Sequence, residues 1–493
     1  MKRVLSLIGL LLMMSPCMYL YGQTSLRPRG DVNCDWKVSI DDVTDLINMM
    51  LKGVEYHSFY TYAADIDSDK TINIEDVVCL INGLLSRDLS PMPAYSGTLP
   101  VLFINTEDYR DIDSKDDYLH ADWWLDNMGH EEFESIGSAT EPMGMLIKGH
   151  GNYTWNKYDK KSFRIKLDDK EALMGMHSNR HFILLAHADD NLAKLKNTMG
   201  FELSRRIGLA YTPAQEPVEV VLNGQYIGLY FLTEKIRVGK HRVDIEEQMD
   251  GETELVNISG GWLLEIDNSP TPGEFVTIHE RPGSNGKPVR LEVSYHSPEK
   301  LSHEQKTYLK RLLQNANTAI FSSDKMSMEW ERYIDIDTLA MYYIVGEMMD
   351  DLEYFAGSCY MYKHRGDSTK LIFGPVWDFG NAFQRLAIYD DTEFNKFIFE
   401  QPTPFISHWI EELVEYPHFR KVVRDHWQAF YESGFNGLDI DLFINEFVER
   451  IEAAFNADGE RWKPRAIDYQ QKDFKRFIHR KIIWLNTQWG ADN

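Results

Sequence analysis

The chain of 493 residues has only four cysteines and no Cys-x-x-Cys pair. A disulfide-stapled scaffold and a zinc site built on paired cysteines are therefore excluded. After Met14, no stretch approaches 18 unbroken apolar residues, so we expect no transmembrane segment in the mature chain. Basic side chains are also in the minority, with 52 Lys and Arg against 77 Asp and Glu and a formal net charge of −25. That balance argues against a general nucleic-acid binder and against an anionic membrane surface as partner.

The composition that remains is that of a globular protein, with 43% hydrophobic and 26% charged residues. Its length exceeds what one hydrophobic core usually serves, which predicts more than one domain. At the N-terminus, Met1-Lys2-Arg3 is followed by an apolar run from Val4 to Met14 and a small residue at Gly22. This pattern predicts a signal peptide over residues 1–22 and a secreted or cell-surface protein. A lipoprotein anchor at Cys17 is the alternative.

A twelve-residue acidic segment occurs twice, at residues 31–42 and 34 residues later at 65–76. Both copies place side-chain oxygens at positions 1, 3, 5, 9 and 12, and position 7 contributes its backbone carbonyl. This spacing wraps a loop around one calcium ion, which needs about six to eight oxygen ligands. The predicted ligands of the two calcium ions are Asp31, Asn33, Asp35, Lys37, Ser39 and Asp42 in the first loop, and Asp65, Asp67, Asp69, Thr71, Asn73 and Asp76 in the second.

The segments that follow the two loops repeat with the same offset. The matched apolar residues are Val43, Leu46, Ile47, Met50 and Leu51 in the first copy, and Val77, Leu80, Ile81, Leu84 and Leu85 in the second. Their spacing gives each helix one apolar face, and two such faces can pack together. An acidic turn that only caps a helix would explain a single copy. Two copies with matching helices favour calcium loops.

This loop–helix duplication with Asp at position 12 resembles a type I dockerin module over residues 28–88. The resemblance implies a small all-α, EF-hand-like domain that binds two Ca²⁺ ions and docks onto a cohesin domain of a scaffold or surface protein. Position 6, usually Gly, is Trp36 in one copy and Lys70 in the other; a positive φ there costs about 1 kcal/mol. The sequence leaves open whether Cys34 and Cys79 form a disulfide.

A linker over residues 89–97, with two prolines and a glycine, precedes the large domain. The large domain is expected over residues 98–390, with a helical C-terminal extension over 391–493. Strands are expected at 99–105, 145–148, 162–167, 218–222 and 226–233, and a helix at 192–207. Asn223-Gly224 predicts a hairpin turn, and Gly208 predicts the end of the helix.

The stretch from 347 to 383 combines acidic residues with a predicted hairpin. A helix with Asp337 as its N-cap ends near Asp350 and Asp351, strands at 358–364 and 370–373 follow, and Asp378 comes after them. Because a hairpin returns its ends to one edge, we expect these carboxylates to lie close together. Protein kinases use such a layout for a general base and a metal ligand. A solvated helix end, or an arginine pair for Asp378, is the alternative.

Six segments resemble the spore coat protein H (CotH) family of atypical kinases. They are residues 147–155, 160–166, 217–230, 233–236, 262–267 and 374–379, which appear in family order. The resemblance covers about residues 98–390. It implies an α+β fold of the atypical protein-kinase-like type. It also implies an enzyme that transfers phosphate from ATP to protein Ser or Thr with Mg²⁺ or Mn²⁺.

The resemblance also assigns roles to residues. Asp378 takes the metal-binding role, and Asp350 or the adjacent Asp351 is the catalytic base. A lysine of the segment 160–166, with Lys161 and Lys166 as candidates, would hold the nucleotide phosphates. Glu234 and Glu265 either pair with such a lysine or are surface charges. The family often has Asp at the position of Gly380, so Asn381 is the nearest further oxygen ligand.

The sequence therefore predicts a secreted, multidomain phosphotransferase tethered through its dockerin to a cohesin-bearing extracellular assembly. Its phosphate acceptor would be a protein. The rival prediction is a noncatalytic structural or adhesion component of that assembly, linked to polysaccharide degradation, and the scarcity of ATP outside cells favours it. A carbohydrate hydrolase would need a carboxylate pair across a sugar-binding cleft, and the sequence nominates none.

Overall fold

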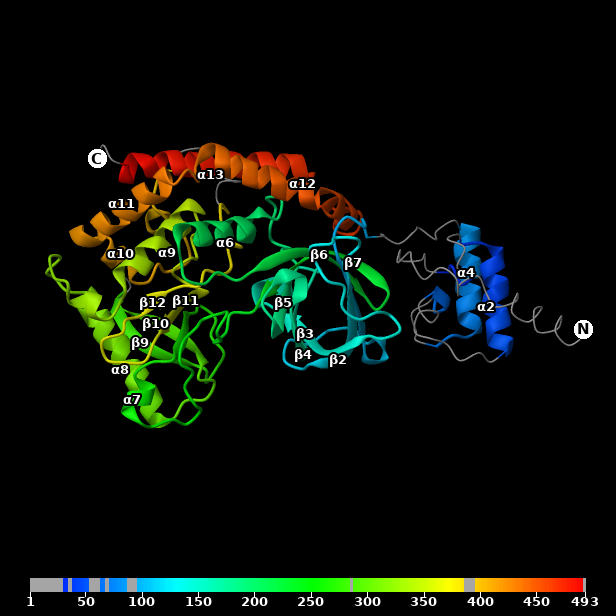
Figure 1. Ribbon diagram of the computed structural model, residues 1–493, viewed down its shortest axis with the longest axis horizontal. Coiled ribbons are helices and arrows are strands. Elements are labelled where there is room, and N and C mark those ends of the chain that lie inside the picture. The colour runs from blue at the N-terminus through cyan, green and yellow to red at the C-terminus, as the bar shows by residue number, and fades with distance from the viewer. Residues whose placement is uncertain are drawn as a thin grey trace, which may run out of the picture. The chain divides into compact units, whose positions relative to one another are not determined.

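The computed structural model describes residues 30–33, 38–52, 63–66, 71–86, 95–283, 287–384 and 395–490. The predicted signal peptide, most of the linker and the loop residues Asp35, Lys37, Asp67 and Asp69 lie outside the described residues. The chain divides into two compact units, which are described separately below. The first comprises Met1–Ala188, Glu216–Leu232 and Arg450–Pro464, and the second comprises Asp189–Gln215, Thr233–Glu449 and Arg465–Asn493 (Figure 1). In the described part of the chain, no helix is both long and apolar enough to cross a membrane.

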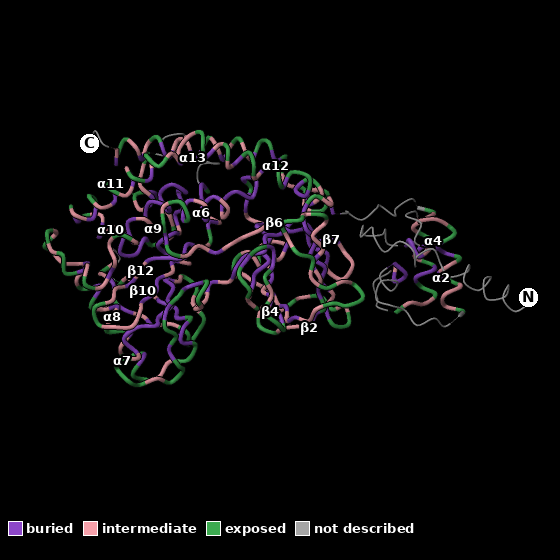
Figure 2. Tube along the Cα trace, viewed as in Figure 1, coloured by how far each residue is buried: buried purple, intermediate pink, exposed green. Residues whose placement is uncertain are grey.

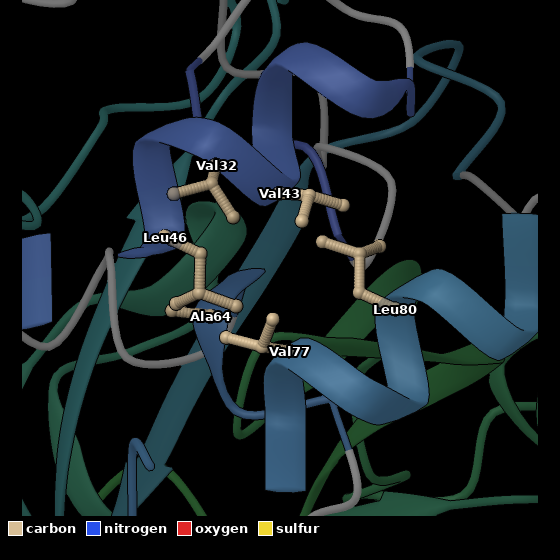
Figure 3. Packing of buried hydrophobic residues seen from close by; sticks show 6 residues of the cluster. All are labelled: Val32, Val43, Leu46, Ala64, Val77 and Leu80. Carbon is tan, nitrogen blue, oxygen red and sulfur yellow. The ribbon is translucent and has the colours of Figure 1, made fainter. Parts of the chain in front are cut away.

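The N-terminal part consists of helices α2 (Ile40–Lys52) and α4 (Ile74–Ser86). Each helix has two acidic residues in its first turn, where the helix dipole favours negative charge. The helices pack on each other through a small apolar core, shown in Figure 3. Its buried residues are Val32, Val43, Leu46, Ala64, Val77 and Leu80. Equivalent residues of the two copies thus meet in the core.

The predicted apolar face of these helices is too broad. Ile47, Leu51 and Leu85 are 38%, 80% and 79% exposed, respectively. Helix periodicity placed them beside the core residues, but the contact between two helices buries only a narrow stripe of each. The rest of the core comes from Val32 and Ala64, which precede the helices.

Seven strands of the first unit form a closed barrel in the order β1-β2-β3-β4-β5-β7-β6. The strands are β1 (Val101–Thr106), β2 (Leu119–Asp126), β3 (Met143–His150), β4 (Ser162–Glu171), β5 (Asn179–Leu185), β6 (Gln215–Leu222) and β7 (Gln225–Glu234). Strands β1 to β5 pair antiparallel in succession, and β1 pairs in parallel with β6. Short helical turns η2 (Glu107–Tyr109), α5 (Tyr153–Lys157) and η3 (Leu173–Gly175) lie between the strands. The large domain is therefore β-rich, but this seven-stranded barrel is not specific to protein kinases.

Two sequence predictions are confirmed in the barrel. Along β4, Phe163, Ile165 and Leu167 are buried and alternate with half-buried residues, as a strand requires. Asn223 and Gly224 have φ values of 52° and 75°, which is the left-handed conformation of a tight hairpin turn.

The end of helix α12 (Gly437–Trp462) is held to Lys160 and to strand β7 by the buried side chain of Asp458. Asp458 Oδ1 accepts hydrogen bonds from Lys160 Nζ at 2.5 Å and from the backbone N–H of Leu229 at 2.8 Å. Gly228 has a φ of 115°, and a Cβ there would clash with the Asp458 carboxylate. Lys160, one of the basic residues of segment 160–166, therefore has a structural partner.

The second unit contains a five-stranded sheet in the order β12-β11-β8-β10-β9. Its strands are β8 (Trp262–Ile266), β9 (Phe275–Pro282), β10 (Pro288–Ser297), β11 (Cys359–Lys363) and β12 (Ile372–Phe373). Its helices are α6 (Leu195–Ile207), α7 (Leu255–Ile258), α8 (His303–Ile320), η4 (Glu329–Arg332), α9 (Ile336–Met348), η5 (Ile398–Glu400), α10 (Ile410–Leu413), α11 (Pro417–Glu432) and α13 (Ile467–Trp489). The predicted helical C-terminal region is thus confirmed.

Helix α9 is the central helix of this unit and contacts α6, α11, α13 and β12. It is buried along most of its length (Figure 2), as expected for a helix that is apolar on all sides. Its N-cap is Asp335, whose side chain accepts a hydrogen bond from the N–H of Thr338, and not Asp337 as predicted. Both aspartates suit an N-cap by type, so only the position of the first turn could decide between them.

Candidate functional site

The hairpin predicted between residues 358 and 373 is present. Strands β11 and β12 pair antiparallel, with Met361 opposite Phe373. The chain after α9 then lies beside the chain after β12, because Asp351 and Ala382 form an antiparallel bridge. The hairpin thus brings Asp351 and Asp378 into one neighbourhood, as the sequence predicts.

Asp378 occupies a strained position in this neighbourhood. Its backbone has a φ of 58°, its side chain is exposed, and its Oδ1 accepts a hydrogen bond from the N–H of Gly380 at 3.3 Å. In the described part of the chain, no arginine or lysine forms an ion pair with it. The pKa of Asp378 is raised to about 7, first because surrounding protein displaces part of its hydration and then because Asp189 and Glu353 repel its charge.

Asp351 lies on the segment that bridges to Ala382, four residues after Asp378. Its side chain is fully buried, and its Oδ1 accepts a hydrogen bond from the N–H of Glu353 at 3.0 Å. Its Oδ2 has no hydrogen-bond partner among the described residues. Burial raises the pKa of Asp351 well above its usual range, and the charges of Glu353 and Asp378 raise it further. The unpartnered Oδ2 is the atom of Asp351 that could accept a hydrogen bond from a further group.

Asp350 has a different environment, although it is adjacent in sequence. Its Oδ1 accepts hydrogen bonds from Lys481 Nζ at 2.8 Å and from Gln401 Nε2 at 2.7 Å. Lys481 also lies 3.1 Å from Glu347 Oε2, and all three charged side chains are buried. Asp350 has a φ of 47°, so the chain turns sharply there. The charge of Asp350 is thus balanced by Lys481, whereas that of Asp351 faces other carboxylates.

Asn381 lies within the same acidic group. Its side-chain nitrogen donates a hydrogen bond to Glu353, which also accepts one from the side chain of Asn268. The amide oxygen of Asn381 is consequently the atom that a metal could bind. Among the described residues, no three His, Cys, Asp or Glu side chains converge as a complete metal cage. Magnesium usually binds through one or two carboxylates together with phosphate and water, so it does not need such a cage.

The two lysines predicted to bind the nucleotide and the acidic residues belong to different units of the chain. Lys161 and Lys166 belong to the first unit, and the acidic residues belong to the second. Lys161 precedes β4 and lies 5.4 Å from the centre of the Trp155 ring, while Lys166 is half-buried in β4.

Glu234 and Glu265 both contact side chains other than lysine. Glu234 Oε1 lies 3.1 Å from Arg242 Nε, and Glu234 also accepts a hydrogen bond from the hydroxyl of Tyr211. Glu265 Oε2 lies 2.7 Å from His296 Nε2. The pairing with a strand lysine that the sequence left open is therefore not seen for either glutamate in the described part of the chain.

Three further residues of the site were missed from the sequence: Asp189, Lys196 and Glu353. Helix α6 brings in two contacts to the segment around Asp378. Lys196 Nζ donates to the carbonyl of Gly380 at 2.7 Å, and Asn197 Oδ1 accepts from the N–H of Phe379 at 2.9 Å. The sequence indicated them only through a run of polar residues at 189–191 before a predicted helix. That run does not show which residues they contact.

The described parts of the two calcium loops share one local architecture. Asp42 Oδ1 and Oδ2 accept hydrogen bonds from the N–H groups of Asn33 and Ser39 at 3.0 and 2.8 Å. Asp76 accepts hydrogen bonds from the N–H groups of Ile66 and Asn73 at 2.5 and 2.8 Å. Ser39 and Asn73 are equivalent loop positions, whereas Asn33 and Ile66 are positions 3 and 2. The aspartates at positions 1 and 12 of both loops are buried. Buried carboxylates at loop ends fit a bound divalent cation, which offsets the cost of burying their charge.

Fold and sites together define a protein with an N-terminal calcium-loop module and a larger β-rich domain with a helical C-terminal region. Residues 147–485 match the family model described as CotH kinase protein, and residues 29–85 match the type I dockerin domain. The first match covers more than half of the chain. The protein therefore belongs to the CotH kinase protein family and carries an N-terminal type I dockerin domain. No curated protein matches the chain.

Proposed function

We propose that the large domain transfers phosphate from ATP to a protein Ser or Thr, with Asp378 as metal ligand and Asp351 as base. The observation that supports this most is the pair of carboxylates joined by the β11–β12 hairpin. Asp351 has an unpartnered buried oxygen, and no basic side chain of the described residues forms an ion pair with Asp378. An acidic pair that served only stability would be expected to have such a partner.

Each residue would have a defined task in this reaction. A bound Mg²⁺ or Mn²⁺ ion would neutralise the phosphate oxygens. Asp378 and the amide oxygen of Asn381 would hold that ion. Asp351 would orient the acceptor hydroxyl and take its proton through Oδ2, which has no hydrogen-bond partner among the described residues. Asp350 would act indirectly, since its ion pair with Lys481 fixes the turn that presents Asp351.

Binding of nucleotide to the full chain separates this function from its rival. Titration calorimetry with ATP should show one binding event per chain when Mg²⁺ or Mn²⁺ is present and none when the metal is chelated. The metal is required because four negative phosphate charges would otherwise meet an acidic site. If neither metal supports ATP binding, the domain is a noncatalytic structural or adhesion component of its assembly.

For the N-terminal domain we propose two Ca²⁺ ions and docking onto a cohesin of a scaffold or surface protein. Type I dockerin domains bind calcium, and dockerins bind cohesin. Among the described ligand residues, Asp31, Asp42, Asp65 and Asp76 at the loop ends are buried, as calcium-binding carboxylates would be. Such a partner would belong to an extracellular or cell-surface assembly, a location that the predicted signal peptide would also give.

Calcium removal should unfold much of the dockerin. Because each loop gathers several carboxylates, their repulsion should melt α2 and α4 when the ion is absent. In circular dichroism of the full chain, addition of calcium should increase the helical signal, and the Asp31→Ala/Asp65→Ala variant should lose that increase. The matched control is Asp45→Ala, which changes an aspartate of α2 outside the loop. An identical calcium response in the double variant would contradict the ligand assignment.

A further inference from the structure

Asp189 and Asp378 face each other over the backbone of Gly380. A Cβ placed on Gly380 would lie 2.5 Å from Asp189 Oδ2 and 3.2 Å from Asp378 Oδ1. Asp189 lies shortly before α6, and Asp378 follows β12, so two distant segments deliver these carboxylates. The absence of a side chain at residue 380 keeps the space between them open.

The charges around this space are mostly negative. Within the described residues, neither Asp189 nor Asp378 forms an ion pair with a lysine or arginine. The ammonium group of Lys196 donates a hydrogen bond to the carbonyl of Gly380 at 2.7 Å, and its charge lowers the pKa of Asp189 and of Asp351 against the larger effect of burial. Asp351 and Glu353 add two more carboxylates, and the buried Oδ2 of Asp351 has no hydrogen-bond partner among the described residues. Several carboxylates gathered around one space repel one another, and a bound cation would offset that repulsion.

We propose that Asp189 and Asp378 bind one divalent metal ion between them, over Gly380. Two carboxylates are hard oxygen ligands, which suit Mg²⁺ or Mn²⁺, and their remaining coordination positions would take water or phosphate. The inference rests on the proposed role of Asp378 and adds a ligand from a different part of the chain. It also predicts that the protein binds the ion before it binds the nucleotide.

Manganese binding without nucleotide tests this site. Electron paramagnetic resonance of Mn²⁺ should be measured on the full chain carrying Asp31→Ala and Asp65→Ala, so that the dockerin loops do not bind the probe. One ion per chain is expected. Asp189→Asn and Asp378→Asn should each weaken its binding about tenfold or more, and Gly380→Ala should weaken it by filling the space. Asp244→Asn, a change of an exposed aspartate in the same unit, should have no effect.

Thermal unfolding distinguishes a loss of metal binding from a folding defect of the variants. Without metal, Asp189→Asn should raise the thermal unfolding midpoint, because it removes repulsion between the two carboxylates; with Mn²⁺, the parent chain should gain more stability than the variant. If Asp378→Asn weakens Mn²⁺ binding and Asp189→Asn does not, the two-carboxylate site is wrong and the proposed function stands. If Mn²⁺ binds only when ATP is present, the resident ion is wrong. If the chain binds neither Mn²⁺ nor metal–ATP, the proposed function fails as well.

Discussion

Replacement of Asp378 by alanine should reduce metal–ATP affinity at least about a hundredfold and abolish phosphotransfer. The metal bridges protein and phosphates in the ground state, so its ligand contributes to binding as well as to the reaction. Titration calorimetry of the full chain with ATP and Mn²⁺ measures the affinity, and transfer of labelled γ-phosphate to the protein itself measures the reaction.

The adjacent carboxylate should behave differently. Asp351→Asn is expected to retain metal–ATP affinity within a few-fold and to lower turnover by about a hundredfold or more, because a base acts mainly in the transition state. Asp351 is preferred over Asp350 because the charge of Asp350 is already balanced by Lys481. Unchanged ATP affinity in Asp378→Ala would refute the metal assignment.

Replacement of Lys481 by methionine should produce the largest loss of stability. The change leaves the buried carboxylates of Glu347 and Asp350 without their ammonium partner, which lies 3.1 and 2.8 Å from them. Breaking a buried ion pair in this way costs about 3–5 kcal/mol. The pKa of Glu347 is already raised to about 7 by burial, with Lys481 opposing the shift, so loss of Lys481 should favour its protonation further.

Thermal unfolding of the full chain measures this effect, with Lys472→Met as the control because Lys472 is an exposed lysine of the same helix. Adding Glu347→Gln and Asp350→Asn to Lys481→Met should recover part of the loss, since no buried charge then remains uncompensated. Equal midpoints for Lys481→Met and Lys472→Met would show that the buried triad does not stabilise the second unit.

Local patterns in the sequence were sufficient for much of the fold. The repeat at residues 31–42 and 65–76 predicted two equivalent loop–helix copies, and Val43 and Val77 do meet in one core. The Asn223-Gly224 turn and the β11–β12 hairpin followed from short-range turn chemistry. These features are encoded by neighbours in the chain, because helix periodicity, strand alternation and positive φ act over a few residues.

The site needed contacts that no local pattern encodes. The sequence placed Asp351 near Asp378, because a hairpin joins them, but it could not distinguish Asp350 from Asp351. That distinction depends on Lys481, which lies 131 residues from Asp350. Likewise, Glu234 pairs with Arg242 and Glu265 with His296. The sequence could not select these partners, because several other basic residues are equally suitable by type.

The sequence by itself thus determined the duplicated loop–helix module, those strands and helices with clear periodicity or turn signals, and the segment that carries Asp351 and Asp378. Tertiary structure alone decided which charges are balanced and which face one another. Asp189 meets Asp378 only because α6 is held against the chain around Gly380 by Lys196 and Asn197. The physical reason is that the energy of an ionised side chain depends on its burial and on its neighbours in space. Both are properties of the folded chain.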